Sequence, residues 1–318
     1  MVATLTVLAL IGAGAAALLE WWTSGQLNPL ASEECAIEVG EHRVTLHPEQ
    51  AMHAATIAAV AEQRGLPARA ITIALATAYQ ESDLYNVNYG DRDSLGLFQQ
   101  RPSQGWGTPE QVQDPVYAAG AFYDELVKID NYRELEITDA AQRVQRSAFP
   151  EAYAQHESNA RALASALSGN SAAGLTCTFR PASHEVEQPG DDGLTPRARS
   201  VLEEIQAAHG PLTVGGFDPD GIDQGHIAGS AHYDGRAIDI FFRPHDEPAS
   251  KRSGWVVANW LVINADRLGI ATVIYDDQIW TARRSAEGWR AYTHPSGNTT
   301  DPTLRHLDHV HVDVAQGG

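Results

Sequence analysis

Basic residues are scarce in this sequence. It has 22 Lys and Arg residues against 41 Asp and Glu residues, and its formal net charge at pH 7 is −19. Because binding to a phosphate backbone needs a basic surface, this balance argues against nucleic acid as a partner. The 318 residues, 43% of them hydrophobic, are enough for two domains that each have a core.

Cysteine is scarcer still, with only Cys35 and Cys177 in the chain. In a protein outside the cytoplasm, two cysteines suit one disulfide, which would close the segment 36–176. The alternative is two unrelated buried thiols. The sequence also lacks internal repeats and low-complexity tracts.

Charge is absent from residues 2–19. As a helix this run would be about 27 Å long, close to the ~30 Å hydrocarbon core of a bilayer. Trp21 and Trp22 follow and suit the membrane interface. We expect a single transmembrane helix in residues 1–22, with the remainder facing the cell envelope. A cleaved signal peptide followed by secretion is the alternative, although no basic segment precedes the run.

The rest of the chain divides by its patterns into two domains. Residues 23–34 and 178–193 are polar and predict linkers. Residues 35–177 are Ala-rich and predict a mainly α domain, with helices at 48–65, 67–82, 114–129 and 138–169. Residues 194–318 predict an α+β domain, with helices at 195–209 and 253–269 and strands at 236–242, 270–280 and 308–314.

The last predicted strand gathers ionisable side chains on one face. Since side chains alternate along a strand, Val310, Val312 and Val314 share one face, and His309, His311 and Asp313 share the other. A His-x-His pair on a strand is a common way to aim imidazoles at one metal ion or one water molecule. By itself it equally describes a half-exposed strand face.

Partners for this pair occur in GSAHYDGRAIDIFF, residues 229–242. His232 lies in a predicted loop, Gly235 permits a tight turn, and Asp239 lies on the following strand. Two imidazoles and one carboxylate form a normal catalytic zinc set that leaves a fourth position open. We therefore expect Zn²⁺ as the cofactor.

The pattern S-x-H-x-x-G-x-A-x-D, which begins at Ser230, resembles the signature of D-Ala-D-Ala carboxypeptidases, in the lysostaphin, D-Ala-D-Ala peptidase and Hedgehog group of zinc folds. The resemblance implies that His232, Asp239 and His311 bind zinc. It also implies that Ser230 contacts substrate and that His309 acts as a base or transition-state stabiliser. The carboxypeptidases usually have Glu-x-x-His where this chain has Asp308, and His-x-His is more like the endopeptidases of the group.

Residues 79–86, YQESDLYN, end the helix predicted at 67–82. Glu81 falls at the flank of that helix's apolar stripe, where desolvation can raise the pKa of a carboxyl group, as a general acid requires. A single Glu after an apolar helix is more often simply solvated.

The motifs SLGLFQQRP at 94–102 and DPVYAAGAFYDEL at 114–126 follow. Together with Glu81 they are similar to lytic transglycosylases and goose-type lysozymes. The resemblance implies a lysozyme-like fold, with Glu81 as the catalytic acid/base. It also implies cleft residues, which are Ser82, Gly96, Leu97, Phe98 and Gln99. The family's Ala-Tyr-Asn-Ala-Gly motif is replaced by AAQRVQRSAFPEAY at 140–153, where Gln145 or Tyr153 could substitute for the missing groups.

Both resemblances point to one polymer, as in cell-envelope proteins of actinobacteria that combine such domains. The sequence predicts a membrane-anchored bifunctional peptidoglycan hydrolase, in which Glu81 cleaves glycan strands and a zinc site cleaves peptide stems. The alternatives are an envelope scaffold that binds the wall without cutting it, and a protein in which only the zinc domain is active.

Overall fold

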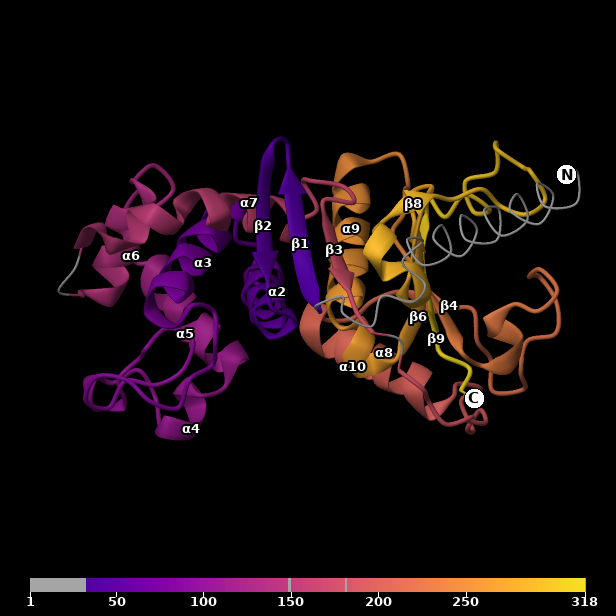
Figure 1. The fold of residues 1–318 in the computed structure, drawn as a ribbon, viewed down its shortest axis with the longest axis horizontal. Coiled ribbons are helices and arrows are strands. Elements are labelled where there is room, and N and C mark those ends of the chain that lie inside the picture. The colour runs from indigo at the N-terminus through magenta and orange to yellow at the C-terminus, as the bar shows by residue number, and fades with distance from the viewer. Residues whose placement is uncertain (1–32, 148–149, 181, 318) are drawn as a thin grey trace, which may run out of the picture.

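The computed structural model describes residues 33–147, 150–180 and 182–317. Figure 1 shows helices at one end, a large sheet at the other, and a small sheet with α2 and α9 between them. The chain is therefore mixed α and β in both halves.

The first half combines a three-stranded sheet with helices. Its elements are β1 (Glu34–Val39), β2 (His42–Leu46), α2 (Pro48–Gln63), α3 (Ala68–Ser82), η1 (Pro102–Gln104), α4 (Pro109–Val112), α5 (Pro115–Leu126), α6 (Ile137–Gln145), η2 (Pro150–His156), α7 (Glu157–Leu167) and β3 (Leu175–Thr178).

The small sheet corrects the expectation of a mainly α segment. Its order is β2-β1-β3, and both pairings are antiparallel. Cys35 on β1 lies opposite Cys177 on β3, and the two form a disulfide across a sequence separation of 142. The last strand of this half therefore pairs with its first.

Reducing this disulfide is expected to lower the free energy of unfolding by about 2–5 kcal/mol, because the bond closes a long loop in the unfolded chain. The measurement is the urea midpoint with and without dithiothreitol. A Cys35→Ser, Cys177→Ser double variant should unfold at the lower midpoint in both conditions. Equal midpoints for oxidised and reduced wild type would contradict this prediction.

The second half is built on a six-stranded sheet. Its elements are α8 (Pro196–His209), β4 (Val214–Gly215), η3 (Ala231–Asp234), β5 (Ala237–Phe241), α9 (Pro248–Ile263), α10 (Ala265–Leu268), β6 (Ile270–Tyr275), β7 (Gln278–Thr281), η4 (Ala282–Glu287), β8 (Arg290–Ala291) and β9 (His309–Val314). The strand order is β4-β5-β9-β6-β7-β8, with every pair antiparallel.

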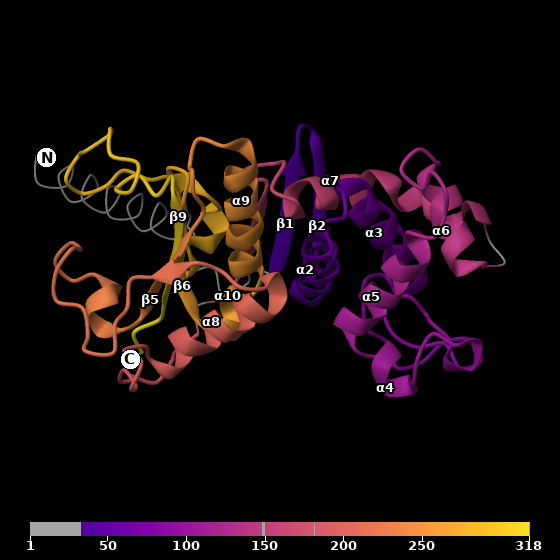
Figure 2. The same ribbon diagram turned by 180° about the vertical axis from the view of Figure 1, so that it is seen from behind.

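Helices α8, α9 and α10 pack on one face of this sheet (Figure 2). The valines of β9, Val310, Val312 and Val314, are buried toward these helices at 0–1% exposure. Because side chains alternate, His309, His311 and Asp313 point to the opposite face. The helix layer thus fixes which face of β9 carries the histidines.

The two halves share one hydrophobic core. Helix α9 contacts both α7 and β3 of the first half. The buried Asn259 side chain donates a hydrogen bond to the Ala166 carbonyl at 2.9 Å. At Gly169, an added Cβ would lie 2.2 Å from the Arg252 carbonyl oxygen, so the two backbones meet closely there.

The structure does not bear out the expectation of a transmembrane helix. Among the residues that the structure describes, no helix is both long and apolar enough to cross a membrane. The predicted segment, residues 1–22, lies outside these described residues. The expected single-pass anchor and membrane localisation have no support in the part of the chain that the structure describes.

Candidate metal centre

Strand pairing brings two of the predicted ligands together. In the β5–β9 register Asp239 lies directly opposite His311, so their side chains share one face of the sheet. His232 arrives from η3, where the Ser230 hydroxyl accepts a hydrogen bond from the His232 amide at 3.4 Å. Gly235 then turns the chain into β5 with a φ of +64°.

Three donor atoms converge at this point. His232 Nε2 lies 3.1 Å from His311 Nδ1 and 3.3 Å from Asp239 Oδ1, and His311 Nδ1 lies 3.1 Å from the same carboxylate oxygen. All three residues are buried, and the cluster can hold a metal ion. Tetrahedral zinc with bonds of about 2.0–2.1 Å separates its ligands by about 3.3 Å, so the donor set fits zinc.

Each histidine is oriented by an acceptor behind it. His232 Nδ1 donates to the Gly216 carbonyl at 2.7 Å, which leaves the Nε2 lone pair facing the cluster. His311 Nε2 faces Asp313 Oδ2 at 3.5 Å, which leaves Nδ1 free in the same way. Gly216 has a φ of +82°, and a Cβ there would lie 2.5 Å from the His232 ring. Glycine is therefore required at that contact.

The charges in the cluster support metal binding. Burial opposes ionisation of Asp239, but His232 and His311 outweigh it and hold the pKa of Asp239 far below its usual range. Burial also opposes protonation of His311, and the carboxylates of Asp239 and Asp313 override it and raise its pKa to about 9. Both shifts reflect the preference of the buried Asp239 carboxylate for a positive charge beside it, which a metal cation could supply in place of a proton.

Replacing Asp313 by alanine is expected to weaken zinc binding about 10–100-fold, because His311 loses the group that orients its ring. The measurement is the Kd for zinc in competition with a chromophoric chelator. Asp266→Ala removes an exposed carboxylate that is not part of this cluster, and should leave the Kd unchanged. An Asp313→Ala variant with the wild-type Kd would contradict the orienting contact.

His309 lies next to the donor cluster without joining it. Its Nε2 is 3.7 Å from Asp239 Oδ1, and its Nδ1 donates to Asp308 Oδ1 at 2.8 Å. The second Asp308 oxygen, Oδ2, accepts hydrogen bonds from Arg243 Nε at 3.0 Å and from Arg243 Nη2 at 2.7 Å. Arg243 was not anticipated, because a single Arg after a strand carries no signal in the sequence.

A cavity of about 800 Å³ opens over the cluster. Ser230, the predicted substrate contact, lines it together with His309. Three histidines that the sequence left outside the ligand set also line it, namely His226, His294 and His306. The His226 ring stacks on His232 with centroids 4.0 Å apart, so it covers a ligand without joining the cluster.

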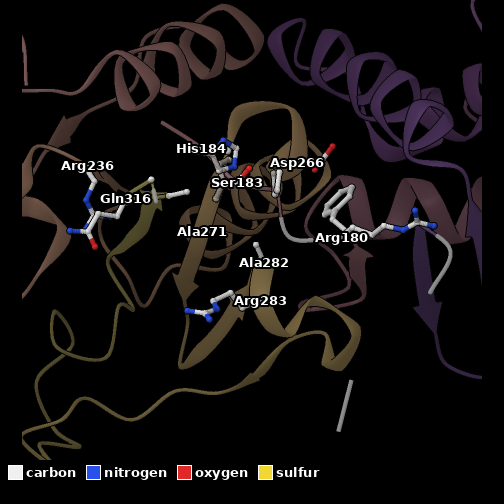
Figure 3. Close-up of a pocket in the computed structure, with 16 residues that line it drawn as sticks. Arg180, Ser183, His184, Arg236, Asp266, Ala271, Ala282, Arg283 and Gln316 are labelled. Carbon is white, nitrogen blue, oxygen red and sulfur yellow. The ribbon is translucent and has the colours of Figure 1, made fainter. Parts of the chain in front are cut away.

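A different cavity, of about 610 Å³, lies beside β6 and the segment after β9 (Figure 3). Its three labelled arginines, Arg180, Arg236 and Arg283, point in different directions rather than at a common centre. Arg236 is already engaged by Asp234 and by the Val314 carbonyl. This cavity therefore shows no convergent set of side chains like that of the histidine cluster.

Glu81 occupies the last turn of α3 in the first half. Burial raises the pKa of its carboxyl group, although hydrogen bonds from Tyr153 and Gln145 oppose this shift. The Tyr153 hydroxyl donates to Glu81 Oε1 at 2.8 Å. Gln145 Nε2 also donates to the Phe98 carbonyl at 2.7 Å, which links the glutamate to the following loop. The structure thus surrounds Glu81 with the two residues that could substitute for the missing motif.

The predicted cleft residues separate into two groups. Leu97 and Phe98 are fully buried, and Phe98 stacks on Phe122 at 4.8 Å, so their side chains belong to the core, and a place for this loop in a sugar cleft stays a prediction. Ser82 and Gln99 are partly exposed, and the Ser82 hydroxyl donates to the Leu97 carbonyl at 2.8 Å. At Gly96 an added Cβ would lie 2.2 Å from the Val112 carbonyl oxygen. These contacts hold the loop against the end of α3.

A comparison with known proteins found one family model that is similar to part of the second half. Residues 190–303 match the family described as VldE, C-terminal domain, and VldE is related to D-Ala-D-Ala peptidase-like proteins. The matched range includes His232 and Asp239 and ends before His309 and His311. No curated protein matches the chain. The lysozyme-like assignment of residues 35–177 stays a prediction.

Proposed function

We propose that this chain is a peptidoglycan hydrolase in which a zinc site cleaves peptide stems and Glu81 cleaves glycan strands. The observation that carries the proposal is the buried cluster of His232, Asp239 and His311, with His309 beside it in an open cavity. Three protein ligands and an open position are the arrangement of catalytic zinc sites, whereas structural sites use four ligands.

Zinc, when bound, would polarise a peptide carbonyl and activate a water molecule. In this proposal His309 would take a proton from the attacking water through Nε2, which lies 3.7 Å from Asp239 Oδ1, and would return it to the leaving amine. His232, Asp239 and His311 would hold the ion, and Gly216 and Asp313 orient the two histidines. The cavity wall at Ser230 and His294 is where the stem peptide would lie.

At Glu81 the proposed chemistry is general acid catalysis. A buried carboxyl group with a raised pKa keeps its proton to a higher pH than an exposed glutamate and can give it to the glycosidic oxygen. A lytic transglycosylase can work with one such group, whereas hydrolysis of the usual kind needs a second carboxylate. The Tyr153 hydroxyl fixes the orientation of Glu81 through Oε1.

The test uses the full chain, loaded with zinc and incubated with purified peptidoglycan, with products read by mass spectrometry. Stem peptides shortened in a chelator-sensitive way, together with anhydro-muramyl ends, are the expected products. A wall-binding scaffold is the second candidate, favoured by the replacement of the Ala-Tyr-Asn-Ala-Gly motif by AAQRVQRSAFPEAY at 140–153. Folded, zinc-loaded protein that pellets with the wall and releases nothing would support the scaffold instead.

A further inference from the structure

Asp308 is held on both of its carboxylate oxygens. Oδ1 accepts from His309 Nδ1 at 2.8 Å. Oδ2 accepts from Arg243 Nε at 3.0 Å and Nη2 at 2.7 Å, and from the Thr303 hydroxyl at 3.3 Å. The residue is 5% exposed, and its backbone carbonyl accepts from the Phe242 amide at 2.8 Å. The carboxylate therefore has little freedom to turn toward the metal cluster.

The Arg243 side chain is exposed, and its guanidinium contacts both Asp308 and an aromatic ring. It follows β5 by two residues, and its guanidinium lies 4.4 Å from the centroid of the Phe241 ring. The same ring lies 5.6 Å from the His309 ring. The guanidinium thus lies over the Phe241 ring while its Nε and Nη2 both donate to one oxygen of Asp308.

We propose that Arg243 and Asp308 are positioning residues that hold His309 with its proton on Nδ1 and its Nε2 lone pair facing the metal cluster. This inference rests on the proposed peptidase function and deepens it. It assigns proton transfer to His309 rather than to Asp308, even though Asp308 stands where carboxypeptidases of the resembled group have their glutamate.

The arrangement makes a specific prediction for the isosteric variant Asp308→Asn. A guanidinium only donates hydrogen bonds, so it turns the carbonyl oxygen of the new amide toward Arg243 and the amide NH₂ toward His309. His309 Nδ1 must then accept, and its proton moves to Nε2, where it blocks the lone pair that faces the cluster. Removing Arg243 from this variant frees the amide to rotate and restores the original tautomer.

The experiment compares kcat on stem peptides for wild type, Arg243→Ala, Asp308→Asn and the double variant, each loaded with zinc. We expect kcat to fall about 10³–10⁴-fold in Asp308→Asn, as when a histidine is held in the wrong tautomer. The double variant should recover at least about tenfold over Asp308→Asn, with KM and zinc content close to wild type. A structural role for Arg243 would instead make the second substitution more damaging.

The matched control is Arg267→Ala. Arg267 pairs with both carboxylate oxygens of Glu204, at 2.8 and 2.6 Å, and is not among the residues lining the cavity. Its kcat should equal that of wild type. A double variant no faster than Asp308→Asn would overturn the inference.

A second readout separates this inference from the proposed function. ¹⁵N NMR of the zinc-loaded chains reports which His309 nitrogen carries the proton, without any substrate. We expect the proton on Nδ1 in wild type, on Nε2 in Asp308→Asn, and on Nδ1 again in the double variant. If the three chains show these proton positions but wild type hydrolyses no stem peptide, the positioning contacts are supported and the proposed peptidase function is refuted. A proton that stays on Nδ1 in Asp308→Asn would overturn the inference, whatever the activity.

Discussion

Replacing His311 by alanine is expected to abolish stoichiometric zinc binding and to lower stem-peptide hydrolysis about 10³-fold or more. His311 Nδ1 lies 3.1 Å from the donor atoms of both other ligands, so its loss leaves two ligands and an open side. A catalytic metal lowers the activation free energy by several kcal/mol, and a loss of about 4 kcal/mol slows the reaction about a thousandfold.

The measurements are zinc content by mass spectrometry of the metal and release of shortened stem peptides. His245→Ala is the matched control. His245 is a histidine of the same half of the chain, and it is not among the residues lining the cavity. It should keep one zinc ion per chain and the wild-type rate. A His311→Ala variant that also keeps both would place the metal elsewhere and contradict the assigned ligands.

The donor cluster was predicted from two local patterns together with the resemblance to D-Ala-D-Ala carboxypeptidases, which singled out His311 rather than His309 as the ligand. Alternation along residues 309–314 put His311 on a polar face, and the spacing of His232 and Asp239 supplied a turn followed by a strand. Strands β5 and β9 then pair in a register that sets Asp239 against His311. A shift of the pairing register by one residue would turn the Asp239 or the His311 side chain into the core. Burial of the β9 valines therefore fixes the register in which these two side chains lie opposite each other.

The contacts that orient the histidines of the cluster could not be predicted from the sequence. Gly216 contacts His232 from 16 residues earlier, and Arg243 reaches Asp308 from 65 residues away. No periodicity links such positions, since only the folded sheet brings them together. Asp308 was noticed by its spacing from His311, but its occupied oxygens are a tertiary property.

Helices followed the sequence patterns more closely than strands. The run predicted at 48–65 corresponds to α2, which begins at Pro48 and ends before Gly65. The helix predicted at 138–169 is interrupted, because Arg146 has a φ of +52° and Pro150 begins a separate 3₁₀ segment.

The strand predicted at 270–280 is a hairpin, turned at two aspartates with positive φ, Asp276 and Asp277. The small sheet was missed because β3 has four residues, and its pairing with β1 depends on contacts across most of the first half. Short strands of this kind are defined by distant partners, which local alternation does not report.

Replacing Glu81 by glutamine is expected to lower glycan cleavage about 10²–10⁴-fold, the usual contribution of a general acid, while stem-peptide hydrolysis is unchanged. The amide keeps the shape of the side chain and can still accept the Tyr153 hydrogen bond, so only the transferable proton is lost. The measurement is the yield of anhydro-muramyl ends and of shortened stems from the same digest. Glu125→Gln is the matched control, since Glu125 is partly exposed and pairs with Lys128.

The pH dependence of glycan cleavage distinguishes the acid role from a structural one. Burial raises the pKa of Glu81, so its proton is retained to a higher pH than in an exposed glutamate. Because only the protonated carboxyl group can donate, the rate should fall as pH rises through that pKa, and peptide hydrolysis at the zinc site should not follow the same curve. Glycan cleavage that persists in Glu81→Gln with an unaltered pH profile would show that Glu81 supplies no proton.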